Sequence, residues 1–453
     1  MKFDTLKDDL LSLADTGLKY AKNQGAEQAE IFVSSQHSSD IQNQQGMIDA
    51  KDGSNDGVGV RVAIGKKLGF AAMSGLTKDS VKHAVSEALS VVKSVKEENV
   101  DFESFVSKSP IAKDGILDDK IITLTTEELV SETNKLFLDA KNFDEKIISA
   151  SGQTQASYGG YAIVNSEGMS GASLYTYLVY ITFVTAALEQ KRKSSFEFSV
   201  TRTIPDELSL GRDCAEKAIK LLDSKPLGFT GPLPTVWNQN VMSDYWRMSF
   251  ANSINGRQVV EKNSYFMDKL GDKVGIDGLT ITDDGQLPEG LNTNCIDLEG
   301  VPRRTTTVID KGVLRSFLYD SYYGRLGKAE STGNAGRGQD YESTPGISQT
   351  TIVIQPGNKN FDDIVAGIDK GILVMDNVMG MGHSNLISGD FSVVANSAYL
   401  IEKGEIAYPL DSITIAGNLY KSFLSILEIG SDSKLLPTVK TPTIAFDGFT
   451  VVG

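Results

Sequence analysis

The segment from Gly382 to Ile406 reads G-H-S-N-L-I-S-G-D-F-S-V-V-A-N-S-A-Y-L-I-E-K-G-E-I. Its last part, Leu400–Ile406, places apolar residues on both sides of the run Glu-Lys-Gly. That pattern predicts a hairpin whose glycine adopts a positive φ. The segment Val308–Leu314 repeats it with Asp-Lys-Gly. Turn residues are frequent and apolar runs are short throughout residues 224–453, so this part is predicted to be a β-rich domain with a few helices.

Helix and strand patterns alternate in the first half of the chain. Leucines and alanines at helical spacing predict a helix over residues 4–24, and strand patterns and a second helix capped by Thr77 follow. After a charged stretch the order of helix, strands and helix occurs again. This order is compatible with an internal structural duplication, but it is also common in α+β domains. The sequence predicts an α+β fold with four parts: an N-terminal unit (1–100), a connector (101–120), a central unit (121–223) and a β-rich C-terminal domain (224–453).

Composition narrows the classes of partner. The chain has 453 residues and a formal net charge of −15, which repels phosphate backbones, so nucleic acid is not a predicted partner. Cys214 and Cys295 lie far apart and are interpreted as buried structural residues, which fits a reducing cytoplasm. The first residues lack the apolar run of a secretory signal. The most apolar segment, Leu174–Leu188, is too short to span a membrane and predicts a buried strand.

Several segments, in the same order along the chain, resemble the TldD/PmbA family, also described as modulators of DNA gyrase. In the N-terminal half they are Gly57–Val62, Gly69–Ala71 and Val164–Gly168. In the C-terminal half, besides Gly382–Ile406, they are Ser264–Phe266, Asp283–Gly285, Ser331–Arg337, Ile415–Asn418 and Val451–Gly453. The resemblance covers nearly the whole chain. It implies a family that contains zinc peptidase subunits and zinc-free partner subunits.

The peptidase branch of this family carries H-E-x-x-x-H on a helix, with two zinc-binding histidines and a glutamate as general base, and a cysteine near the C-terminus. Ligands five residues apart lie about 140° apart on an ideal helix, so such a site needs a distorted or ending helix. The corresponding positions here are Arg247, Met248 and Asn252, none of which suits zinc or proton transfer. The segment Ile429–Pro442 contains no cysteine. The chain therefore resembles the zinc-free branch, PmbA or TldE, and no catalytic or metal-binding residue is predicted.

Four residues are candidates for peptide contact: Asn334, Arg337, His383 and Asp390. Arg337 is suited to hold a carboxylate, such as a peptide terminus, in a bidentate manner. His383 next to Ser384 suggests a catalytic triad, but neighbouring residues on a strand point to opposite faces. His383 is therefore interpreted as a loop residue that hydrogen-bonds backbone or lines a peptide groove. The other two histidines, His37 and His83, are predicted to be exposed.

Three further motifs have structural interpretations. Gly333–Gly338 lacks the Lys-Ser/Thr and the βαβ setting of a phosphate loop, so a turn is predicted. Asp283-Asp284-Gly285 lacks the further spaced acids of a calcium loop and is also predicted to be a turn. Asp118 and Asp119 are predicted to be a solvated pair before a strand.

Three functional hypotheses follow. The favoured one is a PmbA/TldE-like non-catalytic subunit that pairs with a TldD-like zinc subunit and processes peptides in the cytoplasm. The resemblance implies zinc in the partner and no cofactor in this chain, and a homodimer of the isolated chain stays open. The alternative is a self-sufficient hydrolase with a site near His383, Asp390 and Arg337. The third is a regulator of DNA-handling proteins. The acidic charge of the chain argues against direct contact with DNA, but not against binding a basic protein.

Overall fold

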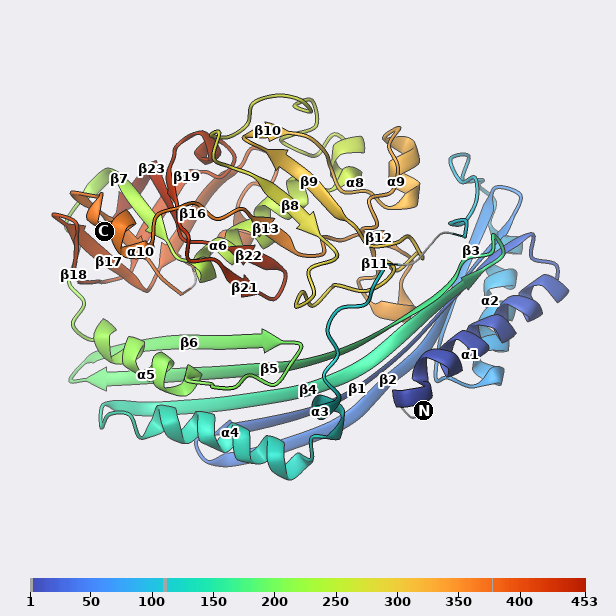
Figure 1. Cartoon of the computed structure of the whole chain (residues 1–453), viewed down its shortest axis with the longest axis horizontal. Helices are drawn as coiled ribbons and strands as arrows, with labels where there is room; N and C mark the ends of the chain where they lie inside the picture. The colour runs from blue at the N-terminus through green and yellow to red at the C-terminus, as the bar shows by residue number, and fades with distance from the viewer. Residues whose placement is uncertain (1–2, 109–111, 377) are drawn as a thin grey trace.

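The computed structural model describes residues 3–108, 112–376 and 378–453, and so residues 109–111 of the predicted connector lie outside the described part. Within it, six antiparallel strands form one long curved sheet in the order β3-β2-β1-β4-β5-β6 (Figure 1). The strands are β1 Gln28–Gln44, β2 Met47–Ile64, β3 Lys67–Ser74, β4 Ile147–Asn165, β5 Ser170–Leu188 and β6 Lys191–Thr201. The predicted N-terminal and central units thus share a single sheet through the pairing of β1 with β4.

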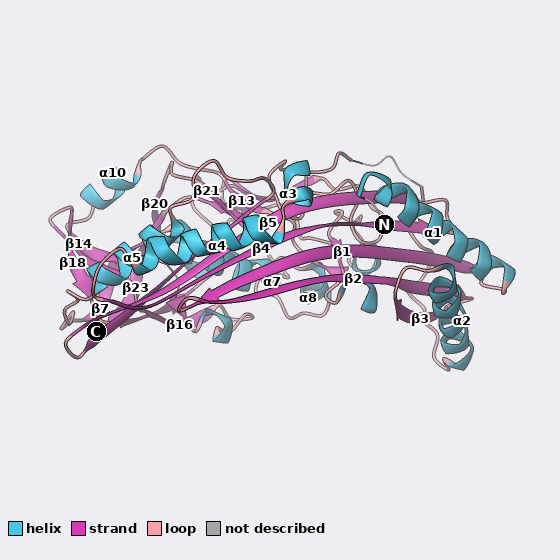
Figure 2. Ribbon diagram, turned by 90° about the horizontal axis from the view of Figure 1, so that it is seen from below, coloured by secondary structure: helices cyan, strands magenta, loops and turns pink. Residues whose placement is uncertain are grey.

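Helices cover the outer, convex face of this sheet (Figures 1 and 2). They are α1 Phe3–Asn23, α2 Lys78–Ser94, α3 Asp119–Thr123, α4 Thr126–Lys141 and α5 Leu210–Leu221. The predicted long helices are confirmed, and the Thr77 hydroxyl accepts a hydrogen bond from Ser80 N, as expected of a helix cap. The order of helix, three strands and helix occurs twice, with the short α3 inserted before the second set.

The two faces of the sheet bury different residues because side chains alternate along each strand. On β5 the even-numbered residues Leu178, Tyr180 and Val184 are buried on the helix side. The odd-numbered residues point to the concave face, above which the C-terminal region lies (Figure 1). The predicted strand at Leu174–Leu188 is therefore confirmed, but only one of its faces is fully buried, and Phe183 on the other face is 45% exposed.

Two further sheets build the C-terminal region, with strand orders β10-β9-β8-β13-β22-β21 and β15-β16-β19-β23-β7-β14-β17-β18. The first contains β8 Ile281–Asp284, β9 Thr305–Asp310, β10 Val313–Leu314, β13 Ile352–Ile354, β21 Lys434–Leu436 and β22 Val439–Thr441. The second contains β7 Thr230–Trp237, β14 Lys370–Val374, β15 Val378–Met379, β16 Asp390–Ala395, β17 Ala398–Glu402, β18 Glu405–Leu410, β19 Ile413–Asn418 and β23 Ile444–Val452, and β20 Ile426–Ile429 pairs with β23.

Short helices connect these strands. They are α6 Gln239–Tyr245, the π-helix η1 Trp246–Phe250, α7 Ala251–Ser253, α8 Gly256–Val260, α9 Ser321–Leu326, α10 Phe361–Ala366 and the 3₁₀ turns η2 Asp340–Glu342, η3 Met381–His383 and η4 Lys421–Leu424. A separate small ladder joins β11 Ala335–Gly336 to β12 Gly346–Ile347. The prediction of an α+β chain with a β-rich C-terminal half is confirmed.

Both predicted Lys-Gly hairpins are present. Lys311 and Gly312 connect β9 to β10 with φ of 48° and 75°, and Lys403 and Gly404 connect β17 to β18 with φ of 54° and 77°. Two successive positive φ angles define the tight turn whose twist matches that of the flanking strands. The Asp-Lys-Gly and Glu-Lys-Gly runs therefore set the register of their hairpins.

Two local predictions were wrong. Asp118 precedes helix α3, not a strand, and its carboxylate accepts hydrogen bonds from Lys120 N and Ile204 N. His37 lies within β1 and is half-buried, because its ring packs beside Tyr158 and pairs with Asp52. Among the described residues, no helix is long and apolar enough to cross a bilayer.

Candidate functional site

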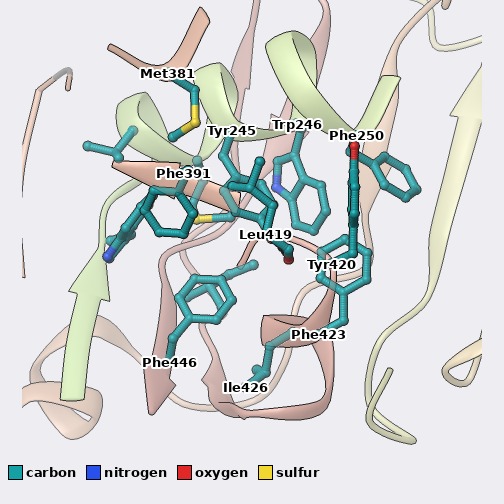
Figure 3. Close-up of a cluster of buried hydrophobic side chains, with 14 of the residues drawn as sticks. Tyr245, Trp246, Phe250, Met381, Phe391, Leu419, Tyr420, Phe423, Ile426 and Phe446 are labelled. Atoms are coloured by element: carbon teal, nitrogen blue, oxygen red, sulfur yellow. Dashed lines mark hydrogen bonds between the residues drawn. The ribbon is translucent and has the colours of Figure 1, made fainter. Parts of the chain in front are cut away.

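The helix that carries Arg247, Met248 and Asn252 changes from α to π geometry at Trp246. Aromatic side chains anchor this segment in the largest core of the C-terminal region (Figure 3). Trp246 and Phe250 are fully buried, and the Trp246 indole donates a hydrogen bond to Thr441 Oγ1 at 3.2 Å. Their burial fixes the rotation of the helix, so that Ser249 is buried with them and Arg247 and Met248 face outward.

The π-helix changes which residues share a face. Its hydrogen bonds run between residues five apart, as from Ala251 N to Trp246 O, so positions 247 and 252 come onto one side. Arg247 and Met248 are exposed and Asn252 is half-buried. The helix is thus distorted at the position where the resemblance places the H-E-x-x-x-H motif of the peptidase branch.

The side chains on this face cannot hold a catalytic metal. Arg247 donates to Asp244 at 3.0 Å, and a guanidinium has no lone pair to offer. Met248 offers a weak, soft thioether, and the Asn252 amide is a poor zinc ligand. Across the described ranges, no group of three or more His, Cys, Asp or Glu residues is placed to bind a metal ion. The residues present therefore do not fit the zinc that the peptidase branch of the family uses.

The turn η3 packs beside this face and carries His383. A Cβ atom placed on Gly382 would lie 3.3 Å from Met248 Cε, so the two segments are in contact. His383 is exposed, while the Ser384 hydroxyl lies 3.8 Å from the Met381 sulfur. Asp390 is exposed and accepts hydrogen bonds from Ser388 and Asn418. In the part of the chain that the structure describes, no hydrogen bond joins these groups into a triad.

Asn334 and Arg337 lie elsewhere and are used by the fold. Asn334 is 1% exposed and donates to Asp283 Oδ2 at 2.6 Å and to the Ser348 carbonyl at 3.2 Å. The Arg337 guanidinium is fully buried and donates to Glu30 Oε1 at 2.8 Å. It does hold a carboxylate, as expected, but that carboxylate belongs to β1 of the same chain. Neither side chain is open to a peptide here, and Arg337 does not join His383 and Asp390 in one site.

Buried charges link the curved sheet to the C-terminal region around Arg337. Arg61 on β2 pairs with Glu30 at 2.6 Å and lies 3.6 Å from Glu299. Burial and, to a smaller extent, the charge of Glu299 raise the pKa of Asp320 in this group to about 6. Sequence reasoning missed this network, because its members are scattered between residues 30 and 337 and no local pattern marks them.

Two more buried carboxylates correct the sequence interpretation or were missed by it. Asp283 was predicted in a turn, but it lies in β8 and accepts hydrogen bonds from Asn334 and Thr350, while Asp284 precedes the turn. Asp297 accepts hydrogen bonds from the backbone N–H groups of residues 299, 301 and 335. Burial raises the pKa of both carboxyl groups, that of Asp297 to about 7.

The cysteines are buried and unpaired, as predicted. Burial raises the pKa of the Cys214 and Cys295 thiols to about 12, so neither is a thiolate nucleophile near neutral pH.

Comparison with known proteins identifies the family. The domain described as "PmbA/TldA metallopeptidase C-terminal domain" matches residues 230–453, and "PmbA/TldA metallopeptidase domain 1" matches residues 29–92. The Haemophilus influenzae protein named "Metalloprotease PmbA homolog" is 28% identical over 410 residues, which cover 88% of this chain and 86% of that protein.

Two solved structures share the fold over nearly the whole chain. The putative modulator of a DNA gyrase from Thermotoga maritima superposes with a TM-score of 0.88 at 25% identity, over 97% of this chain and 99% of that one. TldE from Thermococcus kodakarensis superposes with a TM-score of 0.87 at 22% identity, over 98% of this chain and 100% of that one, which speaks for the fold alone. The sequence resemblance is thus confirmed, and the chain belongs to the TldD/PmbA family of metallopeptidase-related proteins.

Proposed function

We propose that this chain is a zinc-free subunit that pairs with a TldD-like zinc peptidase subunit, and that the pair degrades or processes peptides in the cytoplasm. The observation that carries the proposal is the outward face of the π-helix. Its backbone has the geometry that brings residues five apart together, yet Arg247, Met248 and Asn252 offer neither two nitrogen ligands nor a general base.

The chemistry of hydrolysis is assigned to the partner. A metal-bound water and its general base need ligands and a carboxylate that this face lacks, so the zinc would belong to the TldD-like subunit. The role of this chain is then to complete the assembly and to help hold extended peptide. Pairing of a peptide with an outer strand of the C-terminal sheets would give affinity without side-chain selectivity. His383 and Asp390, exposed beside the π-helix and on β16, remain predicted peptide contacts.

The experiment compares three samples on one unstructured peptide substrate: this chain alone, a TldD-like subunit from the same source alone, and their mixture. Only the mixture should show full activity, and a zinc chelator should abolish it. Size-exclusion chromatography with light scattering would show whether the two subunits co-elute. Chelator-resistant peptidase activity of the isolated chain would contradict the proposal and favour a self-sufficient hydrolase instead.

A second candidate role comes from the name of the Thermotoga maritima structure, a putative modulator of a DNA gyrase. A net charge of −15 opposes contact with DNA but permits contact with a basic protein surface. A salt-sensitive shift of DNA by the purified chain on a native gel would reverse this ranking.

A further inference from the structure

A groove runs between the concave face of the curved sheet and the C-terminal region. It consists of two cavities of about 560 and 610 Å³. Val179 on β5 and Val200 on β6 line both cavities, so the two adjoin. The volume of each cavity lies within the range that is typical of ligand pockets.

The lining of the groove changes from polar to apolar along β5. Tyr175 and Tyr177 line the first cavity, Val179 lies at the junction, and Ile181 lines the second. These four residues share one face of the strand and span about 20 Å at 3.4 Å per residue. Phe198 on β6 faces Ile181 across the ladder and widens the apolar section. A ligand that fills the groove is therefore elongated, with one polar end.

Arg303 lies in the polar section and is the arginine there with unused donors. The residue is 6% exposed, its Nε is enclosed by protein atoms without a hydrogen-bond partner, and its Nη1 donates to the Gly333 carbonyl at 2.6 Å. Among the described residues it forms no ion pair within 4.0 Å. A guanidinium carries five N–H donors, four of them on its two terminal nitrogens, so Nη1 and Nη2 of Arg303 can still bind an anion together.

The neighbouring buried arginines show how unusual this is. Arg202 donates four hydrogen bonds to the carbonyls of residues 116, 290, 291 and 293. Arg337, which also lines the first cavity, uses Nε, Nη1 and Nη2 for two carbonyls and Glu30. The fold thus engages all three guanidinium nitrogens of Arg202 and Arg337, but only Nη1 of Arg303, which lines the groove.

The acids around Arg303 are already engaged. Asp283 accepts from Asn334 and Thr350, Asp297 accepts three backbone N–H groups, and Asp340 accepts from the Ser34 hydroxyl at 2.6 Å. Burial raises the pKa of each of these three carboxyl groups, and the charge of Arg303 partly offsets the rise at Asp283 and Asp297. The open donors of Arg303 therefore suit a carboxylate brought by a ligand.

We propose that this groove binds the C-terminal end of an extended peptide, with the terminal carboxylate on Arg303 and apolar side chains against Val179, Ile181 and Phe198. The apolar section reaches Arg247 on the π-helix, so the groove passes the face discussed above. The inference rests on the proposed function in taking a peptide as the ligand, and it names the part of the peptide that this chain holds.

The test measures binding to the isolated full-length chain, without any partner, by isothermal titration calorimetry. The probes are acetyl-Phe-Gly-Phe-Gly-Ala-Ala with a free C-terminal carboxylate and the same peptide as its C-terminal amide. The acid should bind about tenfold more tightly than the amide, since one charge-assisted bidentate contact distinguishes them. In Arg303→Gln the two affinities should agree within about twofold. Phe198→Ala should weaken both peptides equally and keep their ratio.

Several results would overturn the proposal. They are equal binding of acid and amide to the unaltered chain, an acid preference that survives in Arg303→Gln, and displacement of the acid by millimolar acetate, which would identify a site for small anions. If Arg303→Gln does not fold, as judged by circular dichroism, Val200→Asp replaces it. That change puts a like charge in the groove and should weaken the acid more than the amide. Because no partner subunit is present, these outcomes are separate from a failure to activate a TldD-like peptidase.

Discussion

Arg247 and Arg337 are the same side chain in opposite surroundings. Arg247 stands on the π-helix with 47% of its side chain exposed and one bond to Asp244, a residue of the preceding turn. Arg337 has 0% exposure, a cation–π contact with Phe32 at 4.4 Å and an ion pair with Glu30, which is equally buried. Arg247 lies on the exposed face of a π-helix, and Arg337 joins two regions that lie far apart in the sequence.

The comparison distinguishes the geometry that the backbone sets from the interactions that the side chains make. At the π-helix the backbone brings residues five apart onto one face, but the side chains on that face are not metal ligands. At the buried network the opposite holds, because two loops without regular structure are fixed by ion pairs, Arg337 with Glu30 on β1 and Glu299 with Arg61 on β2. Substitutions at the π-helix should therefore change metal binding and leave the free energy of unfolding nearly unchanged. Substitutions in the network should lower the free energy of unfolding.

The largest effect is expected from Glu30→Gln. The change leaves Arg337 buried and charged without its carboxylate and also removes the nearer of the two carboxylates beside Arg61. Breaking a buried ion pair from one side destabilises a protein by about 3–5 kcal/mol. Urea unfolding followed by circular dichroism would measure the loss. Glu261→Gln, which removes an exposed i,i+4 pair with Arg257, is the matched control and should cost about 0.5 kcal/mol or less. Equal losses in the two variants would contradict the assignment.

The second prediction concerns pH and the same part of the molecule. Asp297 has a pKa of about 7 in the folded chain because it is buried, against 3.8 for an exposed aspartate. Between pH 3.8 and about pH 7 the carboxyl group is ionised in the unfolded chain but protonated in the folded chain. The free energy of unfolding therefore decreases as the pH rises through this range. Below pH 3.8 both states are protonated, and above about pH 7 the full loss has accumulated.

Asp297→Asn removes this titration. The free energy of unfolding of the unaltered chain, minus that of Asp297→Asn, should decrease by about 2.5 kcal/mol between pH 5 and pH 8. Urea unfolding of both proteins at the two pH values gives the difference directly, and changes shared by both proteins cancel. A difference that stays constant with pH would show that Asp297 is ionised throughout this range.

Local patterns predicted much of this fold. The helices α1, α2, α4 and α5 followed from apolar spacing, and the two Lys-Gly hairpins followed from positions that need positive φ. Such signals lie within a few residues of each other, so a single sequence carries them. The absence of zinc ligands at positions 247, 248 and 252 could be inferred in the same way, since it depends on residue type and on the family resemblance.

Contacts between distant residues were not predictable. Arg337 and Glu30 are 307 positions apart, and no local sequence pattern at either residue predicts contact with the other. Arg337 was therefore interpreted as open to a peptide, while Arg303, which keeps unused donors, was not noticed at all. Whether a buried arginine is saturated depends on carbonyl groups from several loops, and only the assembled fold brings those groups together.

The third prediction restores ligands on the π-helix. Arg247→His, Met248→Glu and Asn252→His, made together, place two imidazoles five residues apart on one face with a carboxylate between them. The triple variant should retain several times more zinc than the unaltered chain after dialysis against micromolar zinc. Metal analysis measures this content. The control is Arg247→His alone, which offers one ligand. Equal zinc in the two variants would show that the helix does not align positions 247 and 252.

The smallest effect is expected from Arg247→Ala. The side chain is half exposed, its ion pair with Asp244 is local, and exposed pairs contribute about 0.2–1 kcal/mol at most. The free energy of unfolding should change by about 0.5 kcal/mol or less, measured by urea denaturation beside Arg337→Ala, which should lose several times more. A large loss in Arg247→Ala would mean that this arginine supports the π-helix itself. Its outward face would then be a structural element, and the contrast between the two arginines would fail.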